Sequence, residues 1–258
     1  MTSRRRLAVF CAAAGALVLL ARAQWTEPFP RRAEYQFLRV EYTDHPQARR
    51  FFGNGRRGWW QQDWPEADVH FSQGIRRLTR IETGEPVHLP LTDDRIFDYP
   101  WAYATQTGYW DLKPQETARL REYLDRGGFL VVDDFHGPAD WELFAATMRR
   151  VYPDQVITEI GDTDAVVNLL YTIRERVMIP GLRHLRRGPN GSTIVQPQYS
   201  PPYWRALHDG RGRLVVAINF NQDVGDAWEH ADMPEYPEQM TSLAYRFGIN
   251  YILYAMTH

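Results

Sequence analysis

The feature that most constrains the fold is a short apolar run between two segments of helical periodicity. Residues 129–132 read Phe-Leu-Val-Val, a pattern typical of a strand that is covered on both faces. Before this run, Pro114 is placed to begin a helix and Gly127 to end it in a left-handed conformation. After it, apolar residues recur at helical spacing up to Pro153. Helix, buried strand and helix together predict an α/β domain with a mostly parallel sheet.

Other segments predict the remaining elements of the same domain, which we expect to span residues 34–258. Alternating apolar residues after Glu34 predict a first strand, and a helix is expected from about Pro65 to Leu78. Further strands are expected over residues 87–91, 99–105, 156–160 and 214–220, and a last helix over residues 237–256. Residues 166–173 fit either a strand or a short helix. Residues 180–204, rich in glycine and proline, are expected to form a long loop.

The N-terminus predicts an exported bacterial protein. Three arginines at positions 4–6, an apolar stretch over residues 7–20 and the small residues of Ala21-Arg22-Ala23 have the order of a signal peptide covering residues 1–23. Residues 24–33 would follow as an extended tether. The alternative is a membrane anchor, but an apolar run of 14 residues is shorter than a membrane-spanning helix requires. We therefore expect a periplasmic or secreted domain without a transmembrane helix after cleavage.

Cysteine usage and charge exclude several function classes. The only cysteine is Cys11, so cleavage would leave a chain without disulfides, cysteine nucleophiles or thiolate ligands. The whole chain carries a net charge of −2, and removal of residues 1–23 takes away four arginines and no acid, which leaves −6. A mildly acidic domain lacks the basic field that nucleic acids require. The expected partner is therefore a small polar ligand or a periplasmic protein.

Polar residues follow three of the predicted strands, at the edge where open α/β sheets bind ligands. These residues are candidates for ligand binding: Asp44 after the first strand, then Asp133, Asp134 and His136, and finally Asn221, Asp223, Asp226 and Trp228. If the strands are parallel neighbours, all three groups converge on one rim. Because adjacent side chains of a strand point to opposite sides, we expect only one of Asp133 and Asp134 to face a crevice.

Simpler roles compete with ligand binding at each position. An aspartate at a strand end commonly caps the next helix or fixes a turn, and this is the expectation for Asp133 and Asp226. The carboxylates would suit Mg²⁺ or Ca²⁺, but no spacing matches a known metal-binding loop, so neither a metal nor another cofactor is predicted. The basic residues between Arg183 and Arg187 either bind an anion or are solvated.

Aromatic residues are concentrated over residues 59–64 and 99–110. Flat rings in an exported protein could stack on sugars. Packing in the core is the more common role of such side chains, because each ring buries a large area. We therefore expect most of these rings to lie in the core.

Several blocks of the chain resemble the bacterial family called domain of unknown function 4159. The central block is Leu120-x-x-Tyr123-Leu124-x-x-Gly127-Gly128-Phe129-Leu130-x-x-Asp133-Asp134. The earlier blocks are Phe37-x-Arg39-x-x-Tyr42 and Asp98-Tyr99-Pro100-x-x-Tyr103. The last blocks are Asn221-x-Asp223-x-Gly225-Asp226-x-Trp228 and Ala244-Tyr245-Arg246-x-Gly248-x-Asn250. Together they cover essentially the whole chain after residue 33.

The resemblance implies a three-layer, flavodoxin-like fold similar to the class I glutamine amidotransferases and the trehalose-utilisation proteins. In true amidotransferases a nucleophilic cysteine stands in a turn after the corresponding strand, near the position of Asp134. Without a cysteine there, cysteine-dependent glutamine hydrolysis is excluded. The chain also departs from the family at residues 164–171, where a His-Pro-Ile-Phe block is usual. The resemblance brings no established activity.

Two functions follow as alternatives. The first is a non-catalytic module that binds a ligand or partner, with Asp134 and Asp223 lining the site and Trp228 forming a wall. The second is a carboxylate-dependent hydrolase acting on carbohydrate or cell-wall material. The two carboxylates of a glycosidase lie about 5–10 Å apart across an open cleft. Burial of Asp134 and Asp223, with bonds to backbone N–H groups, would therefore argue against the hydrolase.

Overall fold

The computed structural model of the chain describes residues 33–48, 58–195 and 201–258. The predicted signal peptide and nearly all of the predicted tether lie outside these residues, as does part of the glycine-rich segment after the first strand. Among the residues described, no helix is both long and apolar enough to cross a bilayer.

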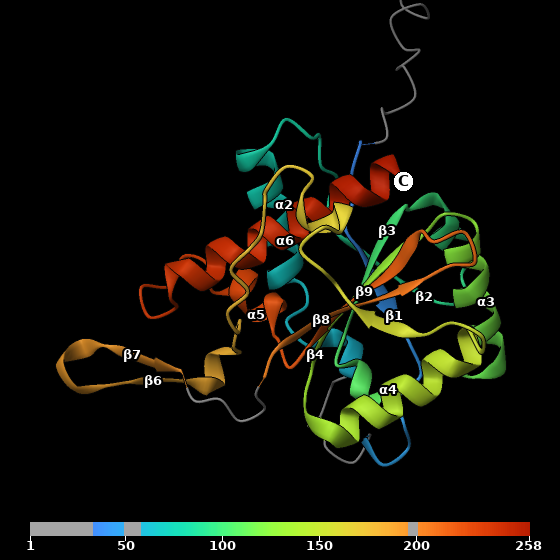
Figure 1. Cartoon of the computed structure of the whole chain (residues 1–258), viewed down its shortest axis with the longest axis horizontal. Helices are drawn as coiled ribbons and strands as arrows, with labels where there is room; N and C mark the ends of the chain where they lie inside the picture. The colour runs from blue at the N-terminus through green and yellow to red at the C-terminus, as the bar shows by residue number, and fades with distance from the viewer. Residues whose placement is uncertain (1–32, 49–57, 196–200) are drawn as a thin grey trace, which may run out of the picture. The chain divides into compact units, whose positions relative to one another are not determined.

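The centre of the domain is a seven-stranded, mostly parallel sheet (Figure 1). Five strands run parallel and lie side by side in the order β2 (Val87–Pro90), β1 (Leu38–Glu41), β3 (Trp101–Thr105), β4 (Phe129–Phe135) and β9 (Leu214–Phe220). Beyond β9, β8 (Tyr203–His208) and β5 (Ile157–Glu159) add two antiparallel pairings. The mixed α/β class with a mostly parallel sheet is therefore confirmed.

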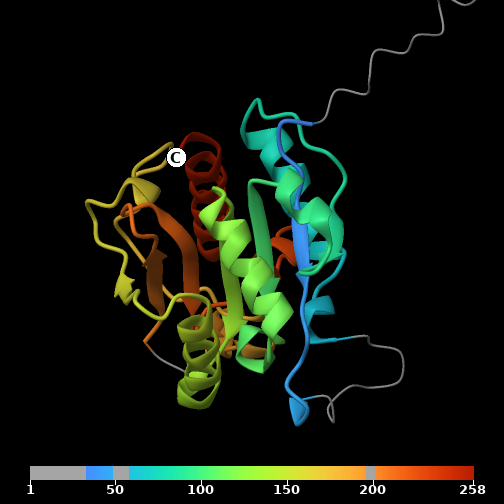
Figure 2. The same ribbon diagram turned by 90° about the vertical axis from the view of Figure 1, so that its right-hand side faces the viewer.

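Helices cover both faces of this sheet, as the two views show (Figures 1 and 2). On one face lie α2 (Glu66–Leu78), α5 (Val224–Glu229) and α6 (Glu238–Thr257), which pack against one another. The other face is covered by α3 (Pro114–Asp125) and α4 (Gly137–Val151). Each face has its own apolar core, one rich in aromatic rings such as Phe71 and Trp101, the other rich in aliphatic side chains.

The local signals around β4 act as the sequence predicts. Pro114 is the first residue of α3, where its missing N–H leaves no helical bond unmade. Gly127 ends this helix with φ +110°, and Gly128 N–H donates to the Tyr123 carbonyl at 2.9 Å. All seven residues of β4 are buried, so the strand continues through Asp133 and Asp134 to the edge of the sheet.

The structure differs from the sequence prediction mainly between residues 165 and 204. Of residues 166–173, only the start belongs to a regular element, the 3-10 helix Ala165–Val167. The expected long loop contains a hairpin of β6 (Leu185–Arg187) and β7 (Thr193–Val195), so the prediction of a loop there is wrong. The glycine and proline residues of the 3-10 turn Pro189–Gly191 form the hairpin's turn, with Asn190 at φ +62°. In Figure 1 this hairpin extends away from the main sheet.

Short 3-10 helices connect the remaining elements. They comprise Trp59–Gln61, Asp94–Asp98, Thr107–Tyr109 and Leu182–His184. The first, third and fourth of these lie at the carboxyl edge of the parallel strands and contribute residues to the site described below.

Candidate ligand-binding site at the carboxyl edge of the sheet

The site begins with an irregularity at the end of β4. Val132 pairs with Ile218 and Phe135 pairs with Phe220, so β4 carries one residue more than β9 between these two pairs. Asp134 lies in this bulge with φ +50°, a backbone conformation that is uncommon for residues other than glycine. Bulges re-aim side chains and are frequent beside functional sites. The bulge thus sets the directions of the two adjacent carboxylates.

Asp133 and Asp134 contact different parts of the edge. Asp133 Oδ2 accepts hydrogen bonds from the Tyr103 hydroxyl at 2.8 Å and from Gly225 N–H at 3.0 Å. Asp134 instead accepts from the Gln106 side-chain amide, and its Oδ1 lies 3.1 Å from His136 Nε2. Of the two, only Asp134 is bonded to residues that line a cavity.

The end of β9 supplies three polar side chains with distinct roles. Asp223 Oδ1 accepts from Asp226 N–H at 3.1 Å and caps α5, so Asp223 and not Asp226 is the helix cap. Asp226 Oδ2 accepts from Leu182 N–H at 2.7 Å. Asn221 accepts from Gly137 N–H and donates to the Pro201 carbonyl, both at 2.9 Å. Its amide thus ties β9 to the start of α4, and its hydrogen-bonding groups are engaged with the backbone.

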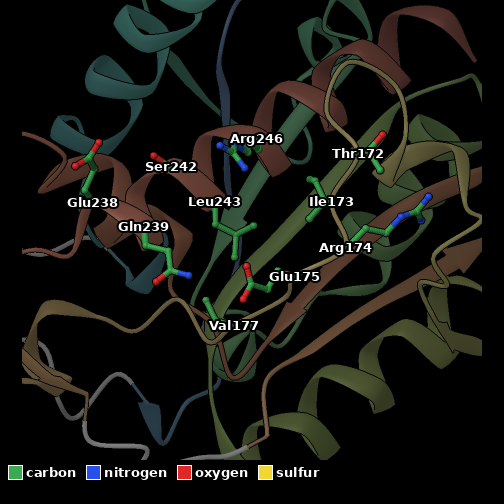
Figure 3. Close-up of a pocket in the computed structure, with 10 residues that line it drawn as sticks. All are labelled: Thr172, Ile173, Arg174, Glu175, Val177, Glu238, Gln239, Ser242, Leu243 and Arg246. Carbon is green, nitrogen blue, oxygen red and sulfur yellow. The ribbon is translucent and has the colours of Figure 1, made fainter.

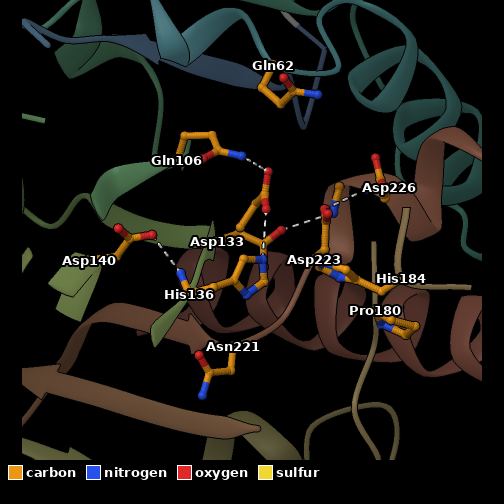
Figure 4. Close-up of polar contacts among 12 residues, drawn as sticks. Gln62, Gln106, Asp133, His136, Asp140, Pro180, His184, Asn221, Asp223 and Asp226 are labelled. Carbon is orange, nitrogen blue, oxygen red and sulfur yellow. Dashed lines mark hydrogen bonds and ion pairs between the residues drawn. The ribbon is translucent and has the colours of Figure 1, made fainter. Parts of the chain in front are cut away.

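These side chains converge in one carboxylate cluster, which we define as Asp63, Asp133, Asp134, His136, Asp223 and Asp226. Figure 4 labels Asp133, His136, Asp223 and Asp226 of this cluster. Atoms of Asp134, His136 and Asp223 that could bind a metal lie within 4.8 Å of one another. The same holds for Asp63, Asp223 and Asp226. The ends of β4 and β9 therefore meet as the sequence predicts, and Asp63 joins them from the segment before α2.

Mutual repulsion and burial raise the pKa values of the carboxylates in the cluster. Burial, and after it the charge of Asp134, raise the pKa of Asp133 to about 7. The same two causes raise the pKa values of Asp223 and Asp226. Burial and the charge of Asp226 raise the pKa of Asp63. The cluster is therefore an unfavourable place for unbalanced negative charge.

A cavity of about 420 Å³ adjoins the cluster. Its lining combines aromatic and polar side chains: Trp59, Gln106, Tyr109, His136, Gly137, Pro138, Ala139, Asp140, Arg183 and His184. Gln106 and His136 belong to this lining and also contact Asp134, so they connect the cavity to the cluster. Arg183 Nη2 lies 3.5 Å from Asp134 Oδ1, and the Arg183 side chain is 61% exposed.

Of the predicted site residues, only His136 is among the described residues that line this cavity, so Asp134 and Asp223 do not line it as expected. Two other predicted site residues lie outside the cluster as well. Asp44 lies at the same edge, but its Oδ1 accepts from Trp59 N–H at 3.1 Å, and it is not part of the cluster. Trp228 is 1% exposed and stacks on Phe71 with a centroid separation of 4.1 Å. Its ring therefore lies in the core and does not form the expected wall. Trp59 and Tyr109, whose centroids are 4.7 Å apart, supply the aromatic lining instead.

Sequence reasoning did not select Asp63, Gln106 or Asp140. Asp140 has a recognisable signal, because an acid in the first turn of a helix after a strand commonly accepts from a backbone N–H; here it accepts from His136 N–H at 3.0 Å. Asp63 and Gln106 both have positive φ, at 60° and 52°, in positions that follow no recognisable turn motif. No local pattern would have found them.

Fold and site together define an α/β protein with a buried carboxylate cluster at the carboxyl edge of its sheet. The family described as domain of unknown function (DUF4159) matches residues 36–256, so the chain belongs to this family. The resemblance drawn from the sequence blocks is thereby confirmed at the level of the family. No curated protein matches the chain.

Proposed function

We propose that this domain binds a small polar ligand in the cavity at the carboxyl edge of the sheet. The observation that carries the proposal is the composition of this cavity, which has aromatic rings and charged side chains around one space of about 420 Å³. Sites for small molecules commonly have volumes of about 300–1,000 Å³ and a few convergent polar groups. The position outside the carboxyl ends of parallel strands is also the usual ligand position in open α/β sheets.

The lining favours a polyhydroxylated ligand such as a sugar. The rings of Trp59 and Tyr109 form the aromatic part of the lining, while Asp140 and Gln106 offer acceptors and Arg183 offers donors for hydroxyl groups. A purely anionic ligand is less well suited, because Asp140 lies in the lining and Asp134 lies behind it, 3.5 Å from Arg183.

A second, larger cavity of about 530 Å³ lies between α6 and the segment before the hairpin (Figure 3). Its charged side chains include Arg174, Glu175, Glu238 and Arg246. No residue of the carboxylate cluster lines it, and the carboxyl ends of the strands lie elsewhere. This second cavity therefore provides an internal comparison for the experiment.

The test is a thermal-shift screen of the purified chain against monosaccharides, disaccharides and cell-wall fragments, followed by calorimetric titration of the hits. A ligand that binds the folded state raises the melting temperature by mass action. We expect Trp59→Ala to weaken the binding of a sugar at least about tenfold, because it removes a stacking face. Arg246→Ala, in the second cavity, is the matched control and should leave the affinity unchanged. Loss of binding in Arg246→Ala but not in Trp59→Ala would overturn the proposal.

Hydrolysis by paired carboxylates is the alternative function, and chromatography of the ligand after incubation distinguishes it. Asp134 and Asp223 are each 2% exposed, and Asp223 holds a backbone N–H of α5. This arrangement supports binding over hydrolysis, because a paired-carboxylate mechanism needs both groups in an open cleft. Cleavage of a bound sugar that is lost in Asp134→Asn would favour the hydrolase.

Two further expectations are part of the proposal. A fold related to the glutamine amidotransferases is supported by Asp134, which has φ +50° near the end of β4, three residues before α4 begins, much as a nucleophile has a strained backbone in an elbow between strand and helix. Export through a signal peptide is supported by the order of residues 1–23 alone. Determining the N-terminus of the chain isolated from the periplasm, with Gln24 as the expected first residue, tests export.

A further inference from the structure

We propose that Asp134, His136 and Asp223 bind a divalent transition-metal cation. One oxygen from each aspartate and one imidazole nitrogen lie within 4.8 Å of one another, and all three side chains are buried. A tetrahedral ion about 2.0–2.2 Å from each ligand separates the ligand atoms by about 3.3–3.6 Å. The 3.1 Å between His136 Nε2 and Asp134 Oδ1 is already close to that separation.

An observation outside these three side chains points to the same occupant. Asp133 is 0% exposed, and its Oδ1 has no hydrogen-bond partner among the residues described. A buried carboxylate oxygen without a donor is costly unless a positive charge lies nearby. Asp133 adjoins the same carboxylates: its other oxygen, Oδ2, accepts from Gly225 N–H at the start of α5, and Figure 4 shows the carboxyl group on that side.

The balance of charge around the cluster also calls for a cation. Its carboxylates belong to Asp63, Asp133, Asp134, Asp223 and Asp226. Among the described residues, Arg183 approaches the cluster but is largely exposed to solvent, and Arg39 is paired with Asp68. A bound divalent ion would supply a positive charge that the described residues do not place inside the cluster.

Two glycines keep space for this cluster. A Cβ atom at Gly181 would lie 2.4 Å from Asp223 Oδ2 and 3.1 Å from Asp226 Oδ2. A Cβ atom at Gly225 would lie 2.8 Å from the Tyr103 hydroxyl and 3.4 Å from Asp63 Oδ2. A larger residue at Gly181 would push into the Asp223 carboxylate, and one at Gly225 would push against the Tyr103 hydroxyl that donates to Asp133.

The three metal-binding side chains indicate which class of metal ion would bind. An imidazole with two carboxylates suits Zn²⁺, Mn²⁺ or Fe²⁺, whereas Mg²⁺ and Ca²⁺ prefer oxygen ligands alone. Three protein ligands leave at least one coordination position for water or a ligand. Because His136 also lines the cavity, the ion would lie at the inner end of the proposed ligand site. The inference rests on the proposed function only in placing the ion beside the ligand.

The test titrates metal ions into the untagged full chain after treatment with EDTA, by calorimetry and without any sugar. We expect saturable binding of Zn²⁺ and Mn²⁺, weaker binding of Mg²⁺, and a rise in melting temperature with the bound ion. Asp134→Asn and Asp223→Asn should each lower the Zn²⁺ affinity at least about tenfold, because losing even an outer partner of a metal ligand costs that much. Asparagine caps helices as well as aspartate does, so Asp223→Asn keeps the cap of α5.

Asp44→Asn is the matched control, since it removes one buried carboxylate at the same edge but outside the cluster. It should bind Zn²⁺ like the unmodified chain. If Asp223→Asn does not fold by circular dichroism, His136→Gln replaces it. Absence of saturable binding, or equal affinity in the cluster variants and the unmodified chain, would overturn the inference. Sugar binding by the metal-free chain would still support the proposed function.

Discussion

The buried carboxylate of Asp68 and the carboxylate cluster differ in their charged partners. Asp68 on α2 accepts a hydrogen bond from Arg39 Nε at 2.9 Å and a second one from the same guanidinium, so its negative charge has a buried positive partner. Arg39 also donates to the Gln62 carbonyl at 2.8 Å and thereby holds the segment before α2 against β1. In the carboxylate cluster, five aspartates approach one another without an equivalent buried arginine among the described residues.

The two regions differ in whether a buried cation opposes the negative charge. Burial alone lowers the pKa of Arg39, but the neighbouring Asp68 carboxylate outweighs burial and raises it. Burial also raises the pKa of Asp68, and Arg39 counters part of that rise. Burial first, and the charge of Asp134 next, raise the pKa values of Asp133, Asp223 and Asp226. Acidic groups with such raised pKa values are more common at functional sites than elsewhere, which agrees with the proposed site.

The largest expected change in stability follows from breaking the ion pair between Arg39 and Asp68. Arg39→Met should lower the free energy of unfolding by about 3–5 kcal/mol, because it leaves the Asp68 carboxylate buried without a partner. Urea unfolding measures this loss. Arg119→Met, which breaks partly exposed pairs with Asp94 and Glu122, is the control and should cost about 1 kcal/mol or less. An equal loss of unfolding free energy in the two variants would contradict the special role of the buried Arg39–Asp68 pair.

The next effect concerns the space around the cluster. Gly181→Ala should cost about 1–3 kcal/mol, because the added Cβ atom would overlap the Asp223 carboxylate. Gly210→Ala adds the same methyl group where nothing lies within 4 Å, so its stability should not fall. Thermal unfolding of the two variants checks the prediction, and an equally stable Gly181→Ala would contradict the packing described for the cluster.

Removing a charge from the cluster should change stability much less than removing Arg39 does. Asp134→Asn is expected to change the free energy of unfolding by about 1 kcal/mol or less, since the lost hydrogen bonds are offset by reduced repulsion. The same substitution should weaken ligand binding clearly. A large fall in melting temperature with unchanged binding would assign Asp134 a structural role.

The smallest effect is expected at the rim. Arg183→Ala should leave stability within about 0.5 kcal/mol of the unmodified chain, because the side chain is mostly solvated. Its effect should appear only in ligand binding, measured by calorimetry. A loss of several kcal/mol would show that Arg183 balances the cluster as Arg39 balances Asp68.

Much of the fold is predictable because its signals are local. Pro114, Gly127 and the apolar run 129–132 act within a few residues, and each takes the predicted role. The meeting of the β4 and β9 ends is also predictable, since parallel neighbours bring their carboxyl ends together. The hairpin of β6 and β7 was missed because its turn residues resemble those of any loop.

The finer composition of the site depends on contacts between distant segments. Asp63 reaches the cluster because Arg39 holds the backbone of the preceding residue, Gln62, which no spacing in the sequence reveals. Asp44 follows a strand like the other candidates, but one of its carboxylate oxygens accepts a hydrogen bond from the Trp59 backbone N–H. Trp228 lies on a helix that turns its ring inward onto Phe71. Each outcome was decided by tertiary packing.

The additional residue in β4 gives this edge an evolutionary freedom that a regular strand would lack. Pairing with β9 resumes at Phe135 opposite Phe220, while Asp133 stays paired with Thr105 of β3, so Asp134 is the position that the register leaves open. A substitution at position 134 therefore changes the chemistry of the edge while the scaffold is inherited intact. Deleting the additional residue would instead restore continuous pairing between β4 and β9 and would remove this arrangement of carboxylates in one step.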